Sequence, residues 1–252
     1  MSKQEPPLES ARRLLEARGW GLIPPNQYLR DMDDEFTGIW ETVKKYTMIS
    51  PERGWALAEA VRYVSKAHIP GDIVECGVWK GGACLLASYI LYSLEPRTER
   101  SIWLYDTFKG MVKPGVNDRI ASSGQALMER DAEGLWAADI NEVRSLMKKS
   151  PLDEGVFNFI AGEVSKTLEL SVPQKIAILR LDTDWYESTL KELRVLYPKM
   201  SKGGVLIVDD YGHFTGARKA VDEYFKKQPI LLHRSDYTGR VVVKSYGDRQ
   251  ES

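Results

Sequence analysis

The stretch ILRLDTDWYEST, residues 178–189, leads from an apolar strand into two aspartates and then into a helix. Residues 178–181 suit a buried strand, and Asp182 and Asp184 follow it almost at once. Two like charges this close together repel each other unless protons or a cation lie between them. The stretch therefore predicts a buried strand of an α/β domain that ends in carboxylates, with protons or a cation between them.

Strand-like and helix-like segments alternate on both sides of this stretch. The expected strands are near-continuous apolar runs at residues 72–77, 101–108, 156–162, 175–182 and 203–211. The expected helices cover residues 83–94, 187–200 and 215–227, after a first helix with Ser50 as N-cap and Pro51 at its first position. Two last apolar runs, joined by DYTG (236–239), predict a hairpin. The pattern predicts a mainly parallel sheet covered on both faces, with one antiparallel strand.

Two segments lie outside this alternation. Residues 1–50 show helical periodicity in two stretches and predict an N-terminal helical cap before a main domain at 51–252. Residues 109–150 are polar, contain glycine and are too long for a simple connection. Such a segment predicts a lid-like insert, and part of 136–149 is expected to be helical.

Composition narrows the class of protein. The 252 residues carry a formal net charge of −1, so no basic field indicates a nucleic-acid or membrane-surface partner. The N-terminal residues lack an apolar leader, and no run of 18 apolar residues occurs, which predicts a soluble cytoplasmic protein. Cys76 and Cys84 are expected to be buried, reduced thiols.

A glycine-containing turn follows the first expected strand. The stretch VECGVWKGGA (74–83) places Glu75, Gly77 and Gly81 between a strand and a helix. Glycines let the backbone approach a ligand closely, and the helix N-terminus offers free N–H groups. Asp106, at the end of the next strand, suits the two hydroxyls of a ribose. A turn with no ligand explains the glycines about equally well, and the spacing is neither G-x-G-x-x-G nor a P-loop.

Carboxylates also end two neighbouring strands. Asp182 and Asp184 end one, and Asp209 and Asp210, in LIVDDYGH, end the next. The carboxyl ends of parallel strands meet at one edge of a sheet, so four carboxylates converge there. A hard divalent ion held by aspartate oxygens, in the manner of Mg²⁺, relieves their repulsion. Helix capping by Asp184 is the structural alternative, but two aspartate pairs favour a metal site.

Six stretches, taken together, resemble the macrocin O-methyltransferase family, the TylF, MycF and NovP type of S-adenosylmethionine-dependent enzymes. The most specific are AILRLDTDWYEST (177–189) and GGVLIVDDYGH (203–213). The others are YTMIS (46–50), GDIVECGVWKGGA (71–83), LYDTFKGM (104–111) and GARKAVDEYF (216–225). The resemblance spans about residues 46–225 and implies a Rossmann-like class I methyltransferase fold with a seven-stranded sheet.

The resemblance also implies roles for single residues. Those implied to contact the cofactor, S-adenosylmethionine, are Thr47, Met48, Glu75, Gly77, Gly81, Asp106, Thr107 and Gly162. Those implied to bind Mg²⁺ are Asp182, Asp209 and Asp210, with Asp184 as the general base and His213 as the alternative base. A homodimer or higher homo-oligomer is implied as well.

The implied reaction is methyl transfer to a hydroxyl of a sugar vicinal diol, in a natural product or related glycoside. Coordination by Mg²⁺ lowers the pKa of such a hydroxyl, and a base can then take its proton. Two alternatives stay open: a catechol-type O-methyltransferase, and a non-catalytic cofactor-binding protein of the same fold. Residues 1–45 and 111–150, where acceptor contacts are expected, do not match the antibiotic-sugar members of the family.

Overall fold

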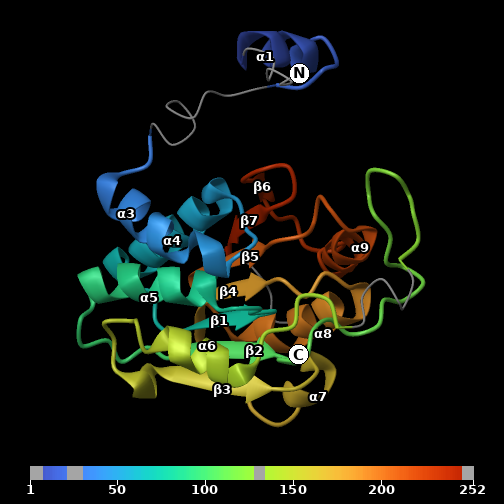
Figure 1. Ribbon diagram of the computed structural model, residues 1–252. Helices are drawn as coiled ribbons and strands as arrows, with labels where there is room; N and C mark the ends of the chain where they lie inside the picture. Colours follow the sequence, from blue (N-terminus) through green and yellow to red (C-terminus); the bar gives the residue numbers. More distant parts are fainter. Residues whose placement is uncertain (1–7, 22–30, 128–133, 246–252) are drawn as a thin grey trace.

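A seven-stranded sheet in the order β3-β2-β1-β4-β5-β7-β6 forms the centre of the protein (Figure 1). The computed structural model describes residues 8–21, 31–127 and 134–245. The strands are β1 (Asp72–Cys76), β2 (Ile102–Asp106), β3 (Phe157–Ala161), β4 (Ile176–Leu181), β5 (Met200–Val208), β6 (His233–Arg234) and β7 (Arg240–Val243). Strands β1 to β5 pair in parallel, whereas β7 is antiparallel to both β5 and β6. The predicted fold class and the C-terminal hairpin are confirmed.

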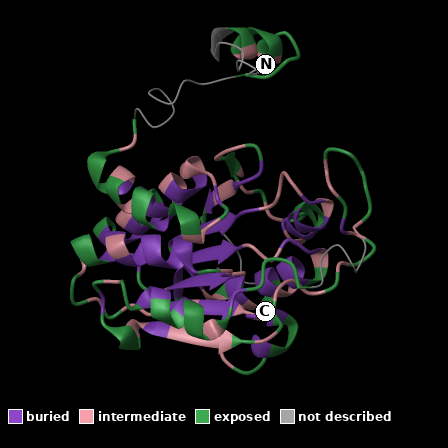
Figure 2. Ribbon diagram, in the orientation of Figure 1, coloured by how far each residue is buried: buried purple, intermediate pink, exposed green. Residues whose placement is uncertain are grey.

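Helices cover both faces of the sheet, and the buried strands lie between them (Figure 2). One face is covered by α3 (Asp34–Val43), α4 (Pro51–Lys66), α5 (Gly82–Leu94) and α6 (Ile140–Met147). The other is covered by α7 (Val164–Thr167), α8 (Tyr186–Leu196) and α9 (Thr215–Tyr224). Successive strand residues serve opposite faces: Ile73 packs in the first layer and Val74 in the second. Both faces are therefore apolar, as the continuous apolar runs predicted.

Local sequence signals explain where two of these helices begin and end. Helix α4 begins where Ser50 Oγ accepts the Arg53 N–H at 3.2 Å, with Pro51 at its first position, as predicted. Helix α8 ends at Leu196, before the expected residue 200. Pro198 lies in a short 3₁₀ turn (Tyr197–Lys199) that replaces the last helical turn. Pro198 has no N–H to donate to the carbonyl four residues before it, so the α-helical hydrogen bonding cannot continue there, which accounts for the early end.

The strand register brings four strand ends to one row. Tyr105, Cys76, Leu181 and Val208 are partners across β2, β1, β4 and β5. The residues that follow them therefore leave the sheet side by side. Backbone bonds continue the row: Asp182 N–H donates to Cys76 O at 2.8 Å, and Asp209 N–H donates to Leu181 O at 2.9 Å. This edge is where the sequence predicted that the aspartates meet.

The insert at 109–150 is anchored where it is described. Trp185 Nε1–H donates to Val112 O at 2.8 Å, and Trp185 and Phe214 pack against apolar residues of the insert. Asp118, which is buried, accepts the Tyr186 N–H at 2.8 Å and so caps the start of α8. The interpretation of Asp184 as the cap of this helix is therefore wrong. Helix α6 confirms the expected helix in 136–149, and residues 128–133 lie outside the described part.

The N-terminal segment contains helices, as predicted. Helix α1 (Leu8–Glu16) is drawn apart from the sheet, whereas α3 buries Phe36, Trp40 and Val43 in the same core as α4 and α5 (Figure 1). A 3₁₀ turn (Lys44–Tyr46) then leads to α4. The division into a cap at 1–50 and a domain at 51–252 stays a prediction. None of the described helices is long and apolar enough to cross a membrane.

Candidate active site

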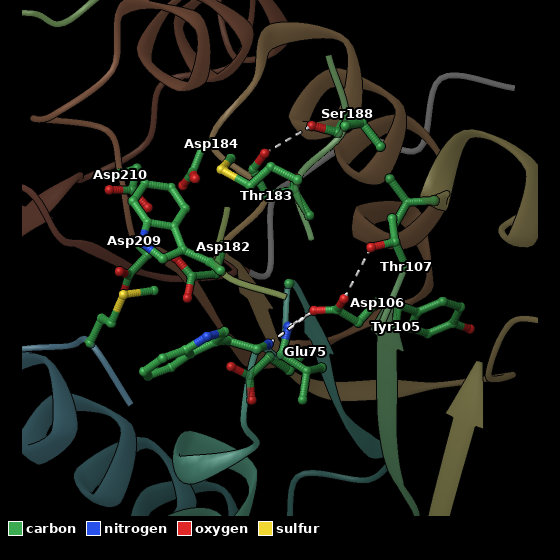
Figure 3. Close-up of a pocket in the computed structure, with 18 of the residues that line it drawn as sticks. Glu75, Tyr105, Asp106, Thr107, Asp182, Thr183, Asp184, Ser188, Asp209 and Asp210 are labelled. Carbon is green, nitrogen blue, oxygen red and sulfur yellow. Dashed lines mark hydrogen bonds between the residues drawn. The ribbon is translucent and has the colours of Figure 1, made fainter. Parts of the chain in front are cut away.

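A cavity opens at the carboxyl edge of β1, β2, β4 and β5, and Figure 3 shows side chains from these strand ends around it. Most residues that the sequence assigned to a site line it: Thr47, Met48, Glu75, Gly77, Asp106, Thr107, Gly162, Asp182, Asp184, Asp209, Asp210 and His213. Gly81 is the exception. Its Cα faces Met147 and Val143 of α6, so it serves the packing of α5 rather than the cavity. The assignment of Gly81 as a cofactor contact therefore lacks support from the structure.

Gly77 shows why a glycine ends β1. Its φ of +86° lies in the left-handed region, and a Cβ there would overlap the Asp182 carbonyl. Only a residue without a side chain lets the ends of β1 and β4 approach this closely. The same approach places Asp182 beside the glycine turn. The predicted cofactor region and the predicted acidic region are thus parts of one cavity.

Asp106 holds the turn after β1 by its carboxylate. Its Oδ2 accepts the N–H groups of Val78 at 2.7 Å and Trp79 at 2.9 Å (Figure 3), and its Oδ1 accepts the Phe108 N–H at 2.7 Å. Trp79 and Phe108 both have positive φ, 47° and 53°. Strained backbone of this kind clusters where surrounding contacts hold a functional geometry. Ribose hydroxyls that bind Asp106 would compete with these N–H groups.

A buried arginine links the two parts of the cavity. Arg180, in β4, is 2 % exposed, and its guanidinium contacts the carboxylates of Glu75, Asp182 and Asp209. The other Glu75 oxygen accepts the Cys84 thiol at 2.7 Å. Burial raises the pKa of Glu75 to about 7, against the opposing effect of Arg180. The Arg180 guanidinium thus balances carboxylates from the ends of β1, β4 and β5.

A second arginine extends this network to the start of α4. Arg53 contacts the other oxygen of Asp209, and its Nε–H donates to Asp236 Oδ2 at 2.9 Å. The N-cap hydroxyl of Ser50 donates to the same Asp236 oxygen at 2.8 Å. Both Asp209 oxygens are therefore paired with arginines, Arg180 on one side at 2.6 Å and Arg53 on the other.

Three carboxylates converge beside this network. One oxygen from each of Asp182, Asp184 and Asp210 lies within 4.8 Å of the others. Burial and the neighbouring carboxylates raise the pKa of all three. An all-oxygen donor set of this charge fits a hard cation such as Mg²⁺, which would relieve the repulsion. The structure thus groups Asp184 with Asp182 and Asp210, whereas Asp209 is held by arginines.

Two candidate bases face the same space. Asp184 is 9 % exposed and lies in the left-handed region, with φ of 67°. His213 lines the cavity beside Phe214 and Tyr237. Burial, and to a smaller degree Arg53, lowers the pKa of His213, so its ring is neutral near pH 7 and able to accept a proton.

Sequence reasoning missed several residues of the cavity and its supports. Arg180 gave a signal, because a charged residue interrupts an otherwise apolar strand. Arg53 and Asp236 gave none, since they lie 183 positions apart and meet only in the fold. The exposed apolar residues of the cavity are Met48, Trp136 and Tyr237, and of these only Met48 was singled out. Trp185 packs against Phe214.

Comparison with known proteins decides the family. The family model described as Macrocin-O-methyltransferase (TylF) matches residues 28–240. The chain belongs to the macrocin O-methyltransferase family. The expected resemblance is confirmed, and with it an O-methyltransferase on the fold of S-adenosylmethionine-dependent methyltransferases.

Individual members of the family are clearly similar to this chain. Demethyldecarbamoylnovobiocin O-methyltransferase of Streptomyces niveus is 37% identical over 185 residues, 73% of this chain and 70% of its own. The 8-demethyl-8-(2,3-dimethoxy-alpha-L-rhamnosyl)-tetracenomycin-C 4'-O-methyltransferase of Streptomyces olivaceus is 33% identical over 213 residues, 84% and 80% of the two chains. The solved structure of the O-methyltransferase NovP has a TM-score of 0.70 at 34% identity and covers 79% of this chain and 82% of its own.

Proposed function

We propose that this O-methyltransferase uses S-adenosylmethionine and Mg²⁺ to methylate a hydroxyl of a vicinal diol on a sugar, in a natural product or related glycoside. The observation that carries the proposal is the single cavity that joins the glycine turn after β1 to the cluster of Asp182, Asp184 and Asp210. The relative from Streptomyces olivaceus, whose name places a rhamnosyl group on its substrate, supports a sugar acceptor.

The cavity residues divide into two binding regions in this proposal. Asp106 and Thr107 would hold the ribose, and Gly162 and Glu163 at the end of β3 would border the adenine. Thr47, Met48, Glu75 and Gly77 would border the methionine part. Asp182 and Asp210, with Asp209 beside them, would hold Mg²⁺, since a carboxylate has more acceptor sites than the two that the arginines use on Asp209. When bound, the cofactor supplies the methyl group and the cation lowers the pKa of the hydroxyl.

Asp184 would take the proton of the acceptor hydroxyl, because it lies against Asp182 and Asp210 within the same cluster. His213, which lines the same cavity, is the alternative base. Asp184→Asn keeps the shape of the side chain and removes its basicity. We expect this variant to bind S-adenosylhomocysteine as the wild type does, to keep Mg²⁺ binding because the amide oxygen stays in the cluster, and to lose turnover by about 100-fold or more. Asp222→Asn, at an exposed residue of α9, is the matched control, and a near-native rate for Asp184→Asn would exclude Asp184 as the base.

An aromatic vicinal diol is the second candidate acceptor. It is favoured by Met48, Trp136 and Tyr237, which line the cavity and are 50%, 42% and 59% exposed, so that they form an apolar mouth. Methyl transfer should be measured by mass spectrometry with a panel of rhamnosides and of catechols, each with Mg²⁺ and with chelator. Turnover of rhamnosides alone supports the proposal, and turnover of catechols alone replaces it with the second candidate. Cofactor binding without any transfer to either class would contradict both acceptor assignments.

A further inference from the structure

Glu192 of α8 is a buried acid outside the cavity lining that holds the residue between two of the site carboxylates. Its side chain is fully buried. The Thr183 hydroxyl contacts both of its oxygens, Oε1 at 2.9 Å and Oε2 at 3.1 Å. Thr183 lies between Asp182 and Asp184 in the chain. From its place on α8, Glu192 thus holds the loop that carries Asp182 and Asp184.

The backbone of this loop is tight and strained. Thr183 O accepts the Ser188 hydroxyl at 3.3 Å (Figure 3) and the Trp185 N–H at 2.7 Å, a bond that the figure does not draw. Between these contacts Asp184 adopts φ of 67°, a conformation that costs free energy for a residue other than glycine. Such a conformation persists only where several surrounding contacts hold it. The side-chain bond to Glu192 holds Thr183 at one end of the strained residue.

A buried carboxyl group at position 192 costs free energy of folding. Burial raises the pKa of Glu192 to about 8, so the group is mostly neutral near pH 7. Burying a polar group stabilises a fold less than a well-packed apolar side chain of similar size. The neighbouring buried residues of α8, Leu193 and Leu196, are apolar and pack in the core as expected. Packing alone therefore favours leucine at 192.

We propose that Glu192 is a positioning residue for the acidic cluster: its bond to the Thr183 hydroxyl holds the left-handed turn at Asp184. By this means it keeps the carboxylates of Asp182, Asp184 and Asp210 together. Without the bond, Asp184 relaxes toward an ordinary backbone conformation and its side chain turns away from the other two. The role of the cluster as a cation site rests on the proposed function, whereas the effect on the turn does not.

The test uses paired variants of both partners. Thr183→Val and Glu192→Leu remove the bond, singly and together, while Thr183→Ser and Glu192→Gln keep it as matched controls. We expect Mn²⁺ affinity, followed by electron paramagnetic resonance, to fall by about 10- to 100-fold in the single and double removals, as for residues that orient metal ligands. The controls and the binding of S-adenosylhomocysteine should stay near wild type. The melting temperature of the double variant should equal or exceed that of the wild type, because it leaves neither buried polar partner unpaired.

A readout without cation separates this inference from the proposed function. Hydrogen exchange of the peptide covering 182–186 reports the Trp185 N–H bond to Thr183 O. We expect faster exchange there in the removals and not in the controls. A wild-type protein that binds no Mn²⁺ contradicts the metal site, and the exchange data then decide the inference alone. A double variant with wild-type exchange overturns the inference, as does one whose melting temperature falls together with its affinity.

Discussion

Glu192→Gln should remove a pH-dependent component of the stability of this fold. In the unfolded chain the carboxyl group titrates near its ordinary pKa of 4.5, whereas in the folded protein burial raises that pKa to about 8. Between these values the folded protein keeps a proton that the unfolded chain has released. The contribution of Glu192 to the free energy of unfolding is therefore fully present below pH 4.5 and is lost progressively as pH rises toward 8.

The size of this effect follows from the shift. Each pH unit inside the window costs about 1.4 kcal/mol, so from about pH 5 to about pH 7 the wild type loses about 2.5 kcal/mol through this group. The Gln variant has no such proton to lose. Relative to the wild type, it should therefore gain about 2.5 kcal/mol in its free energy of unfolding over the same range.

Urea unfolding at several pH values measures this difference. Glu187→Gln, at an exposed residue of the same helix, is the matched control. A difference between Glu192→Gln and wild type that varies by less than about 0.5 kcal/mol across the range, the size of an ordinary surface effect, would refute the reasoning. It would mean that Glu192 ionises in the folded protein as it does in water.

Two further predictions concern the turn after β1. Gly77→Ala should destabilise the fold by more than the ~1–2 kcal/mol that a left-handed alanine costs, because its Cβ would meet the Asp182 carbonyl. Gly38→Ala, in the middle of α3 with open space around it, is the control and should not destabilise the fold. Urea unfolding tests this, and equal stability of the two variants would contradict the close approach of β1 and β4. S-adenosylhomocysteine should change the tryptophan fluorescence if its ribose binds Asp106, because Trp79 lines the cavity beside Asp106 and donates its backbone N–H to that carboxylate. Trp79→Phe should abolish that change, and its persistence would place the ribose elsewhere.

The sequence was sufficient for the fold because strand signals here are local. Strands β1 to β5 are apolar runs buried on both faces, so each could be recognised without knowing its neighbours. The parallel arrangement then placed the ends of β4 and β5 at one edge, which predicted where Asp182 and Asp210 meet. The glycine turn after β1 could also be recognised from the sequence, and the family resemblance added Thr47, Met48, Thr107 and Gly162.

The remainder depends on contacts between distant segments. Asp118 caps α8 from 68 positions away, where the local sequence offered Asp184 instead. Arg53 pairs with Asp209, which lies 156 positions away, so no local sequence signal predicted this pair. Gly81 lies in the glycine-containing turn yet packs against α6, because as the N-cap of α5 its Cβ position points to Val143 and Met147. Such pairings follow from the folded arrangement and not from any periodicity.

Calorimetric titration of S-adenosylhomocysteine and Mg²⁺ into the wild type and Asp210→Asn tests the two-part site most directly. We expect the wild type to bind both ligands and Asp210→Asn to bind S-adenosylhomocysteine with little change while losing most of its Mg²⁺ affinity. Asp222→Asn should bind both ligands as the wild type does. Cofactor binding with no Mg²⁺ binding in the wild type would contradict the metal-assisted reaction, and absence of cofactor binding would contradict the site as a whole.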